Sequence, residues 1–298
     1  MKIICSTVIR AAKQGGIHGG LYVIDTDKGE VIHHAPYEKD FVNDNERGGE
    51  RGLRGISVLS DRIIVADSAG FIELDKKTFQ IKRTFQDSDY FKSIHEIAFY
   101  EDHIWATSTA YDAVVKLDLD FNIQGFWEIL GENIQNYKAL TGKKEITPET
   151  KTENDNYHIN SLCVADGKLR VSGLLTPLYN FDDMTEVCSV PTISMIDDRP
   201  GGNQNSFVHN FYEYEDVFTA NLTSYSAVGF FDKDFSGYGW YNNVSIPRSK
   251  NVKYQVDDVA VNNWNRGLAR SGDKLIIGSS PARIIVYDMK SRKFEKEI

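Results

Sequence analysis

The stretch HEIAFYEDHIWATSTAYDAVVKLD, residues 95–118, decides the fold class of this chain. It holds three short runs rich in apolar, β-branched and aromatic residues, and the polar pair Glu101-Asp102 separates the first two runs as a turn. The predicted strands span residues 97–100, 104–106 and 113–117, with a fourth at 122–127. An antiparallel sheet of this size cannot bury both of its faces alone, so we expect other sheets to pack against it.

The same pattern recurs 114 residues later without a gap. Eight residues of the later copy are identical to those at the matching positions of residues 95–118: His209, Glu215, Asp216, Ala220, Thr223, Tyr225, Ala227 and Val228. Identities at fixed spacing are typical of an internal repeat, and a repeat must be recognised before local structure is assigned.

Further copies begin at residues 54, 160 and 266, and residues 1–40 contain three strand-like runs, IICST, LYVID and EVIHH. Four-stranded units repeated about every 40–50 residues are typical of β-propellers, whereas solenoid repeats are shorter and sandwiches do not repeat a hairpin in this way. We therefore predict an all-β fold, a six-bladed β-propeller of four-stranded antiparallel blades, in one domain over residues 1–298. The approximate blades are 1–45, 50–88, 93–130, 157–200, 207–250 and 254–298.

The sequence leaves two ways for the propeller to close, because the first repeat, residues 1–45, lacks its innermost strand. Its three runs match strands two to four of the other units. Either residues 254–261 supply the missing strand, or residues 17–20 contain it.

A candidate site follows from propeller geometry, in which each first strand begins near the axis on the same face as the loop between strands two and three. We predict His95 and His209 as catalytic acid and base, since histidine exchanges protons near neutral pH. Arginine suits an anion. The predicted substrate-binding residues are Arg54, Asn160, Arg266, Tyr111, Tyr225 and Asp67. The alternative is that these groups are polar because they face water or bond one another between blades.

Three long connections, residues 129–157, 198–207 and 236–265, are predicted to lie on the same face. Long connections in compact domains are often lids or binding loops. Within the first of them, the spacing of Ile134, Tyr137 and Leu140 predicts a short helix, and we treat residues 129–157 as a possible lid.

The amino-acid composition limits which binding partners we expect for the protein. With 43 acidic and 34 basic side chains and a net charge of -9, binding to nucleic acid or an anionic membrane is not expected. We expect a small-molecule or peptide ligand, with a protein partner possible. Three cysteines without a CxxC spacing and no apolar membrane-length stretch favour a cytoplasmic location.

No cofactor is predicted. The chain has no GxSxG, GxxxxGK[ST] or HExxH motif and no GxGxxG after a strand. A divalent metal is the weaker alternative, suggested by paired aspartates such as Asp257-Asp258.

The blade pattern [HR]-x-[IL], then [ED]D-x-[IL]-W, Y-x-A-V and LD, with HINSL at 158 and NRGLA at 265, resembles a bacterial six-bladed propeller family without an assigned activity. The chain is more distantly similar to gluconolactonase, strictosidine synthase and NHL-type propellers. That similarity implies an axial metal held by Glu, Asn and Asp, whereas the matching positions here are Arg, His, Asn, His and Arg.

Two functions remain open from the sequence. The first is an enzyme, a lyase, epimerase or hydrolase, that acts on an anionic or hydroxyl-rich substrate in an axial cavity. The second is a non-catalytic scaffold that binds another protein through the face covered by the long loops.

Overall fold

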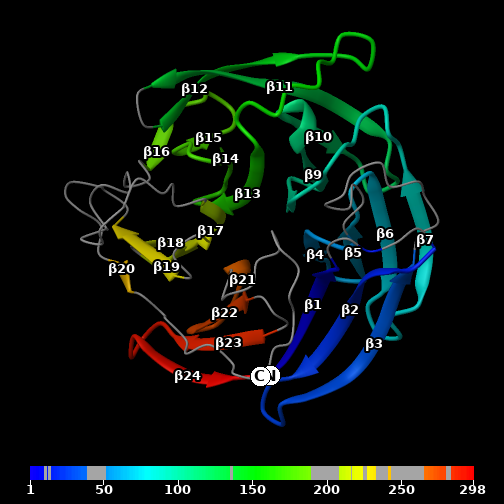
Figure 1. The fold of residues 1–298 in the computed structure, drawn as a ribbon, viewed down its shortest axis with the longest axis vertical. Helices are drawn as coiled ribbons and strands as arrows, with labels where there is room; N and C mark the ends of the chain where they lie inside the picture. Colours follow the sequence, from blue (N-terminus) through cyan, green and yellow to red (C-terminus); the bar gives the residue numbers. More distant parts are fainter. Residues whose placement is uncertain are drawn as a thin grey trace. The chain divides into compact units, whose positions relative to one another are not determined.

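The structure is a computed structural model that describes residues 1–9, 12, 15–38, 52–134, 137–188, 208–215, 217–223, 227–232, 241–242, 265–279 and 283–298. Within these ranges the chain forms six β-sheets and one short 3-10 helix, η1 (Thr109–Tyr111). The fold is the predicted all-β six-bladed β-propeller, and each sheet is one blade (Figure 1). Among the described residues, no helix has the length and apolar character that a membrane crossing requires.

The chain divides into two compact units, Met1–Ile129 with Lys143–Leu162, and Leu130–Gly142 with Cys163–Ile298. Blades 1 to 3 belong mainly to the first unit. Their strands are β1 (Lys2–Val8), β2 (Ile17–Asp25) and β3 (Glu30–Glu38); β4 (Ile56–Val58), β5 (Arg62–Ala66), β6 (Gly70–Asp75) and β7 (Ile81–Gln86); and β8 (Ile97–Tyr100), β9 (His103–Ser108), β10 (Ala113–Leu117), β11 (Ile123–Ile134) and β12 (Tyr137–Glu145).

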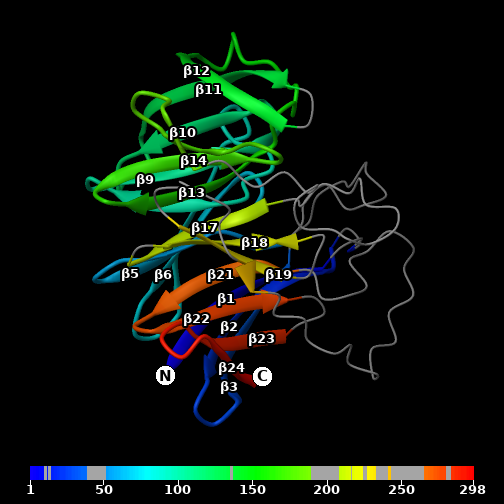
Figure 2. The same ribbon diagram turned by 90° about the vertical axis from the view of Figure 1, so that its left-hand side faces the viewer.

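Blades 4 to 6 belong mainly to the second unit. Their strands are β13 (Ile159–Ala165), β14 (Lys168–Gly173), β15 (Leu178–Asn180) and β16 (Glu186–Cys188); β17 (Val208–Tyr214), β18 (Val217–Leu222), β19 (Ala227–Asp232) and β20 (Tyr241–Asn242); and β21 (Asn265–Ser271), β22 (Lys274–Ser279), β23 (Arg283–Asp288) and β24 (Lys293–Glu297). The strands of blade 6 follow one another in chain order across the sheet (Figure 2).

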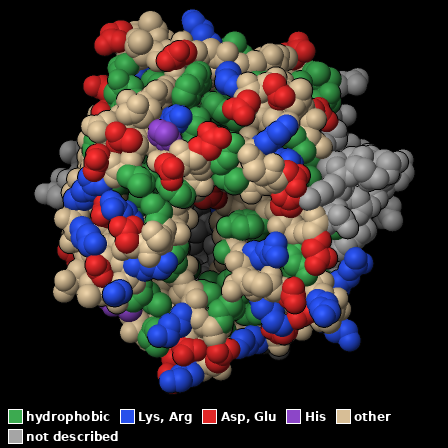
Figure 3. Space-filling view, turned by 180° about the vertical axis from the view of Figure 1, so that it is seen from behind, with side chains coloured by type: hydrophobic (Ala, Val, Ile, Leu, Met, Phe, Trp, Pro, Cys, Tyr) green, Lys and Arg blue, Asp and Glu red, His purple; other side chains and the backbone are tan. Residues whose placement is uncertain are grey.

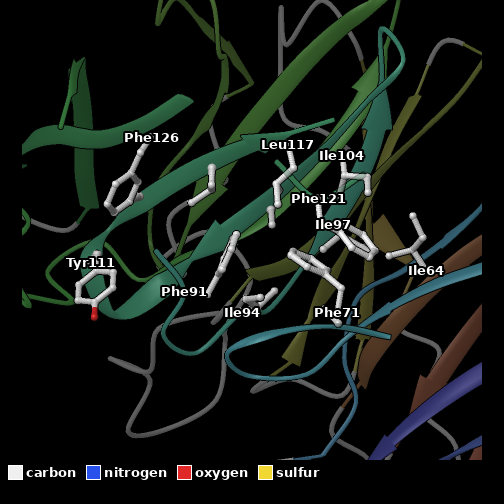
Figure 4. Close-up of a cluster of buried hydrophobic side chains, with 14 of the residues drawn as sticks. Ile64, Phe71, Phe91, Ile94, Ile97, Ile104, Tyr111, Leu117, Phe121 and Phe126 are labelled. Atoms are coloured by element: carbon white, nitrogen blue, oxygen red, sulfur yellow. The ribbon is translucent and has the colours of Figure 1, made fainter. Parts of the chain in front are cut away.

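Strand alternation explains how the blades of the first unit pack. Successive side chains of a strand point to opposite faces, so an inner strand that is apolar at every position buries both faces. In β5, Ile63 and Val65 join a cluster with Leu21 of blade 1, whereas Ile64 and Ala66 join a cluster with blade 3. Figure 4 shows this second cluster, in which side chains of blades 2 and 3 interdigitate.

The second unit repeats this arrangement. In β18, Phe218, Ala220 and Leu222 pack with Leu178 of blade 4. Val228 and Phe230 of β19 pack on the other side with blade 6, in a cluster that includes Ile277. Each unit therefore contains two apolar layers, one on each side of its middle blade.

Two blades depart from the predicted count of four strands. Blade 3 has five, in the order β12-β11-β10-β9-β8, because β11 continues to Ile134 and β12 lies beside it (Figure 1). The helix predicted around Ile134, Tyr137 and Leu140 is therefore wrong. Ile134 ends β11, whereas Tyr137 and Leu140 lie in β12. In the second unit the amide of Leu140 donates to the Tyr179 hydroxyl at 3.1 Å.

Blade 1 has three described strands, β1, β2 and β3, so the missing strand is not within the described part of this blade. Residues 17–20 are not a separate strand, because they form the start of β2, where Gly20 pairs with Thr7 of β1 and with Pro36 of β3. The alternative that residues 17–20 contain the missing strand is therefore wrong. Gly19 allows β1 and β2 to pair this closely, because a Cβ at that position would lie 2.0 Å from the Thr7 carbonyl oxygen. Residues 254–261 lie outside the described residues.

Acidic and basic side chains are interspersed over the described part of the face in Figure 3, without a large area of one sign. Charge of both signs, spread in this way, is usual for a protein surface.

Candidate functional site

His95 lies between two anchors in the first unit. The preceding residue, Ile94, is fully buried in the core between blades 2 and 3. The amides of His95 and Glu96 both donate to the Thr107 hydroxyl, at 3.0 and 3.1 Å. These bonds fix the loop after β7 against β9. They therefore also fix the backbone position from which the His95 side chain extends.

The ring of His95 is oriented through its Nδ1 atom. Nδ1 lies 2.8 Å from the Ser93 carbonyl oxygen and 2.8 Å from the Thr109 hydroxyl. A carbonyl oxygen can only accept, so the neutral ring carries its proton on Nδ1. Nε2 is then the nitrogen with the lone pair, which suits it to take up a proton.

A second histidine stands beside it. The ring of His158 lies edge-on to that of His95, with 4.8 Å between the ring centroids and 67° between the ring planes. Its Nδ1 atom is 2.8 Å from a carboxylate oxygen of Asp155. A carboxylate accepts from Nδ1, so Nε2 is again the basic nitrogen, as in catalytic histidines oriented by an aspartate.

Asp112 holds the segment that carries His158. It ends helix η1 in the left-handed region, with φ of 47°, and its carboxylate is fully buried. The amide of Tyr157 donates to this carboxylate at 3.0 Å, and the amide of Asn156 donates to it as well. Burial raises the pKa of Asp112, while the donated hydrogen bonds oppose this shift.

The chain from residue 146 to residue 158 is bonded at several further points to blade 3 and to the loop between β7 and β8. Ile146 donates its amide to Phe126, Lys151 bonds Asp89, and Glu153 bonds Lys92. Asn154 donates its amide to Ala110 of η1 at 3.2 Å. We call residues 146–158 the strap, because together these bonds determine where His158 lies.

Arg54 contacts the segment that leads into His95 in the first unit. Its Nη1 atom donates to the carbonyl oxygen of Ile94, at 3.2 Å, and its own carbonyl accepts from Ser6 at 2.7 Å. The guanidinium is therefore one residue away from His95. It is half-buried and carries the positive charge expected of an anion-binding group.

Asp67 and Tyr111 occupy structural positions. The Asp67 carboxylate accepts from the Tyr37 hydroxyl at 2.6 Å and from Gln86 at 2.7 Å, joining β3 to β7. Tyr111 is buried in the apolar cluster between blades 2 and 3, with its hydroxyl pointing away from the apolar side chains in Figure 4 and 3.4 Å from the Ser88 carbonyl. We leave both out of the proposed site.

The remaining predicted residues have varied surroundings. His209 and Asn160 are buried, in β17 and β13 respectively, whereas Arg266 of β21 is exposed. The Nδ1 atom of His209 is 3.0 Å from the Thr223 hydroxyl, within the second unit. Tyr225 lies outside the described residues.

The sequence interpretation missed His158, Asp155 and Asp112. His158 and Asp155 precede the strand of blade 4 rather than beginning it, and both have positive φ, 51° and 41°. The signal available was HINSL at 158, which places a histidine two residues before the aligned Asn160. In the described part of the chain, no three His, Cys, Asp or Glu side chains are grouped to hold a metal ion.

No protein-family model and no curated protein matches this chain in sequence. Among solved structures, the chain is similar to a protein of unknown function from Bacteroides caccae, with a TM-score of 0.51 and 10% identity over 99% of this chain and 94% of the other. At this level of identity the similarity concerns the fold, and it supports the β-propeller class.

Two further similar structures are lyases. One is a catalytically inactive virginiamycin B lyase from Staphylococcus aureus with quinupristin, with a TM-score of 0.49 and 12% identity over 84% of this chain and 70% of that one. The other is a streptogramin B lyase, with a TM-score of 0.48 and 12% identity over 84% and 69%.

Proposed function

We propose that this protein is an acid–base enzyme that binds a small, hydroxyl-rich carboxylate, such as an acidic sugar, beside His95 and His158. The observation that carries the proposal is the pair of imidazole rings 4.8 Å apart, each with Nδ1 on an acceptor. Two such rings offer two basic Nε2 atoms, one to remove a proton and the other, when protonated, to return one.

Arg54 supplies the preference for an anion. A guanidinium binds a carboxylate through paired hydrogen bonds, and this one is anchored next to His95 by the Ile94 carbonyl. In the proposed reaction Arg54 holds the substrate carboxylate, and a histidine Nε2 removes the proton from the carbon beside it. The C–H electron pair is delocalised into the carboxylate.

The class of reaction depends on the next step. If the other histidine returns a proton to the opposite face of the carbon, the enzyme is an epimerase. If the C–H electron pair instead forms a double bond to the neighbouring carbon, and a leaving group departs from that carbon with its own bonding pair, the enzyme is a lyase. A hydrolase would instead use one histidine to take a proton from water.

The experiment uses glucuronate and galacturonate, with glucose and galactose as neutral counterparts. Binding is measured by calorimetric titration, and deuterium uptake at C5 of each uronate is followed by NMR in D2O. We expect the wild type to bind a uronate at least tenfold more tightly than its neutral counterpart, with Arg54→Gln removing that preference. His95→Gln and His158→Gln should each slow deuterium uptake at least a hundredfold, because general acid–base catalysis contributes about 10²–10⁴-fold.

His103→Gln is the matched control. His103 begins β9, at the end of that strand away from Ser108, and its Nδ1 contacts the Glu101 carbonyl in a turn. This variant should bind and exchange like the wild type. Equal behaviour of the His95, His158 and His103 variants would contradict the proposal and favour the protein-binding scaffold.

A further inference from the structure

The same side-chain arrangement occurs in both units. Thr109 follows His95 by fourteen residues, and Thr223 follows His209 by fourteen residues. The Thr109 hydroxyl is 2.8 Å from Nδ1 of His95, and the Thr223 hydroxyl is 3.0 Å from Nδ1 of His209. The repeat is therefore one of hydrogen bonding as well as of sequence.

Each threonine also contacts the first strand of the following blade. Thr109 donates to the Ile159 carbonyl oxygen at 2.6 Å, and Thr223 donates to the Asn265 carbonyl oxygen at 2.8 Å. Both threonines are almost fully buried, with 1% and 0% of their surface exposed. Water therefore does not compete for these bonds.

A count of protons assigns the histidine tautomers. A threonine hydroxyl has one proton and two lone pairs, and a carbonyl oxygen only accepts. If the hydroxyl proton goes to the carbonyl, the hydroxyl must accept from Nδ1–H. The opposite tautomer would turn the hydroxyl proton toward Nδ1, and the buried carbonyl oxygen would lose this donor.

We infer that Thr223 is a positioning residue that holds neutral His209 as the Nδ1–H tautomer, and that Thr109 does the same for His95 together with the Ser93 carbonyl. Each therefore directs the basic lone pair to Nε2. The catalytic role of Nε2 rests on the proposed function, whereas the assignment of the Nδ1–H tautomer does not. For His209 the inference identifies a second histidine, in the other unit, that is prepared in the same way.

In the first unit, Nδ1 of His95 has a second acceptor, the Ser93 carbonyl at 2.8 Å. This carbonyl should keep the proton on Nδ1 when the Thr109 hydroxyl is removed. Thr223 is therefore the position at which the effect of removing the hydroxyl is tested.

The test is long-range ¹H–¹⁵N NMR of the uniformly ¹⁵N-labelled full chain at a pH at which the imidazoles are neutral, because ring ¹⁵N shifts report which nitrogen is protonated. In the wild type we expect Nδ1–H to dominate in both rings. Thr223→Val should lower the Nδ1–H population of His209 toward the minority it has in free histidine, and Thr223→Ser should restore it. Thr109→Val should leave His95 mostly Nδ1–H.

A dominant Nε2–H form of either ring in the wild type would overturn the inference, and this result needs no variant to fold. An unchanged His209 tautomer in a folded Thr223→Val variant would overturn the role of Thr223. Uronate binding is a separate readout. Nδ1–H rings without uronate binding would refute the proposed function and leave the inference standing. Uronate binding with Nε2–H rings would refute the inference and leave the proposed ligand class standing.

Discussion

Asp112 is the residue on which the place of His158 depends most. A buried carboxylate is costly unless it is hydrogen-bonded, and here the strap amides of Asn156 and Tyr157 donate to it. Its left-handed backbone brings the chain around from η1 to β10. Burial and the amide bonds act on the pKa of Asp112 in opposite directions, and burial is the larger effect.

We expect Asp112→Asn to change how stability depends on pH. Because the pKa of Asp112 is raised above its ordinary value of 3.8, the folded protein holds this proton more tightly than the unfolded chain does. The contribution of Asp112 to the free energy of unfolding therefore falls as the pH rises from about 4 through the folded pKa, and is constant above it. The asparagine variant lacks this contribution.

Urea unfolding of wild type and variant between pH 4 and pH 8 measures the effect. The free energy of unfolding of the variant minus that of the wild type should rise with pH in the acidic part of this range and then level off. A difference that is independent of pH, or that falls as the pH rises, would contradict the burial of an ionisable Asp112.

The sequence could predict one half of the candidate site at the residue scale. His95 was predicted as a candidate because it precedes the first strand of a repeated unit, and Thr109 recurs with it at the same spacing. His158 was missed because a strap held by Asp112 brings it to His95, and repeat alignment does not reveal such a tertiary bond. Tyr111 matched Tyr225 in the repeat, but its own side chain is part of the core.

Stacking of blades through complementary apolar faces is the main stabilising feature among the elements. Phe71 of β6 lies at the centre of one such layer, stacked on Phe121 at 5.5 Å and edge-on to Phe91 at 5.1 Å. Its surroundings come from both blade 2 and blade 3 (Figure 4). Aromatic pairs of this geometry add to the free energy gained from burial.

Phe71→Ala should lower the free energy of unfolding by about 3–5 kcal/mol, because it leaves a cavity between two blades. Ile81→Ala is the control on the outer strand β7, where the side chain is 61% exposed, and it should cost less than about 0.5 kcal/mol. Chemical denaturation gives both values. Equal losses for the two variants would show that the layer between blades 2 and 3 is not packed as described.

A second element-scale feature is an aspartate at the end of the third strand of a blade. Asp75 accepts from the amides of Lys77 and Thr78, both at 2.9 Å, and Asp118 accepts from those of Asp120 and Asn122 in the same way. These bonds close the turn to the outer strand as Asx turns do. The Leu-Asp pair of the repeated sequence pattern, as at Leu74-Asp75 and Leu117-Asp118, is therefore explained by this turn.

Asp75→Ala should lower the melting temperature, whereas Asp75→Asn should have a smaller effect because its amide oxygen can still accept. Hydrogen bonds from Thr78 and Lys77 hold the pKa of Asp75 below its ordinary value. Its contribution to stability is therefore present above about pH 4 and lost as the pH falls below that value. Thermal melts from pH 2 to pH 7 check both points, and identical melts of the alanine variant and the wild type would refute the role of this turn.

At the scale of the whole molecule, the sequence predicts the fold class because every blade repeats the same apolar spacing. The strands of residues 95–118 were predicted within two residues of those observed. Strand β12 beside β11 was not predicted, because its apolar residues also fit a helical spacing. Two of its amides, those of Lys138 and Leu140, donate to Leu175 and Tyr179 within the second unit, and the local pattern does not reveal such contacts. The local sequence pattern cannot distinguish a strand from a helix where tertiary contacts determine which of them forms.

The central claim is that His95 and His158 form a site for a carboxylate ligand, and a crystal structure of the full chain soaked with glucuronate tests it most directly. We predict density for the sugar, with its carboxylate on the Arg54 guanidinium and its C5 hydrogen facing Nε2 of His95 or His158 at a heavy-atom distance of about 3–3.5 Å. Well-diffracting soaked crystals without ligand density, in which protein groups close off both Nε2 atoms, would contradict the claim.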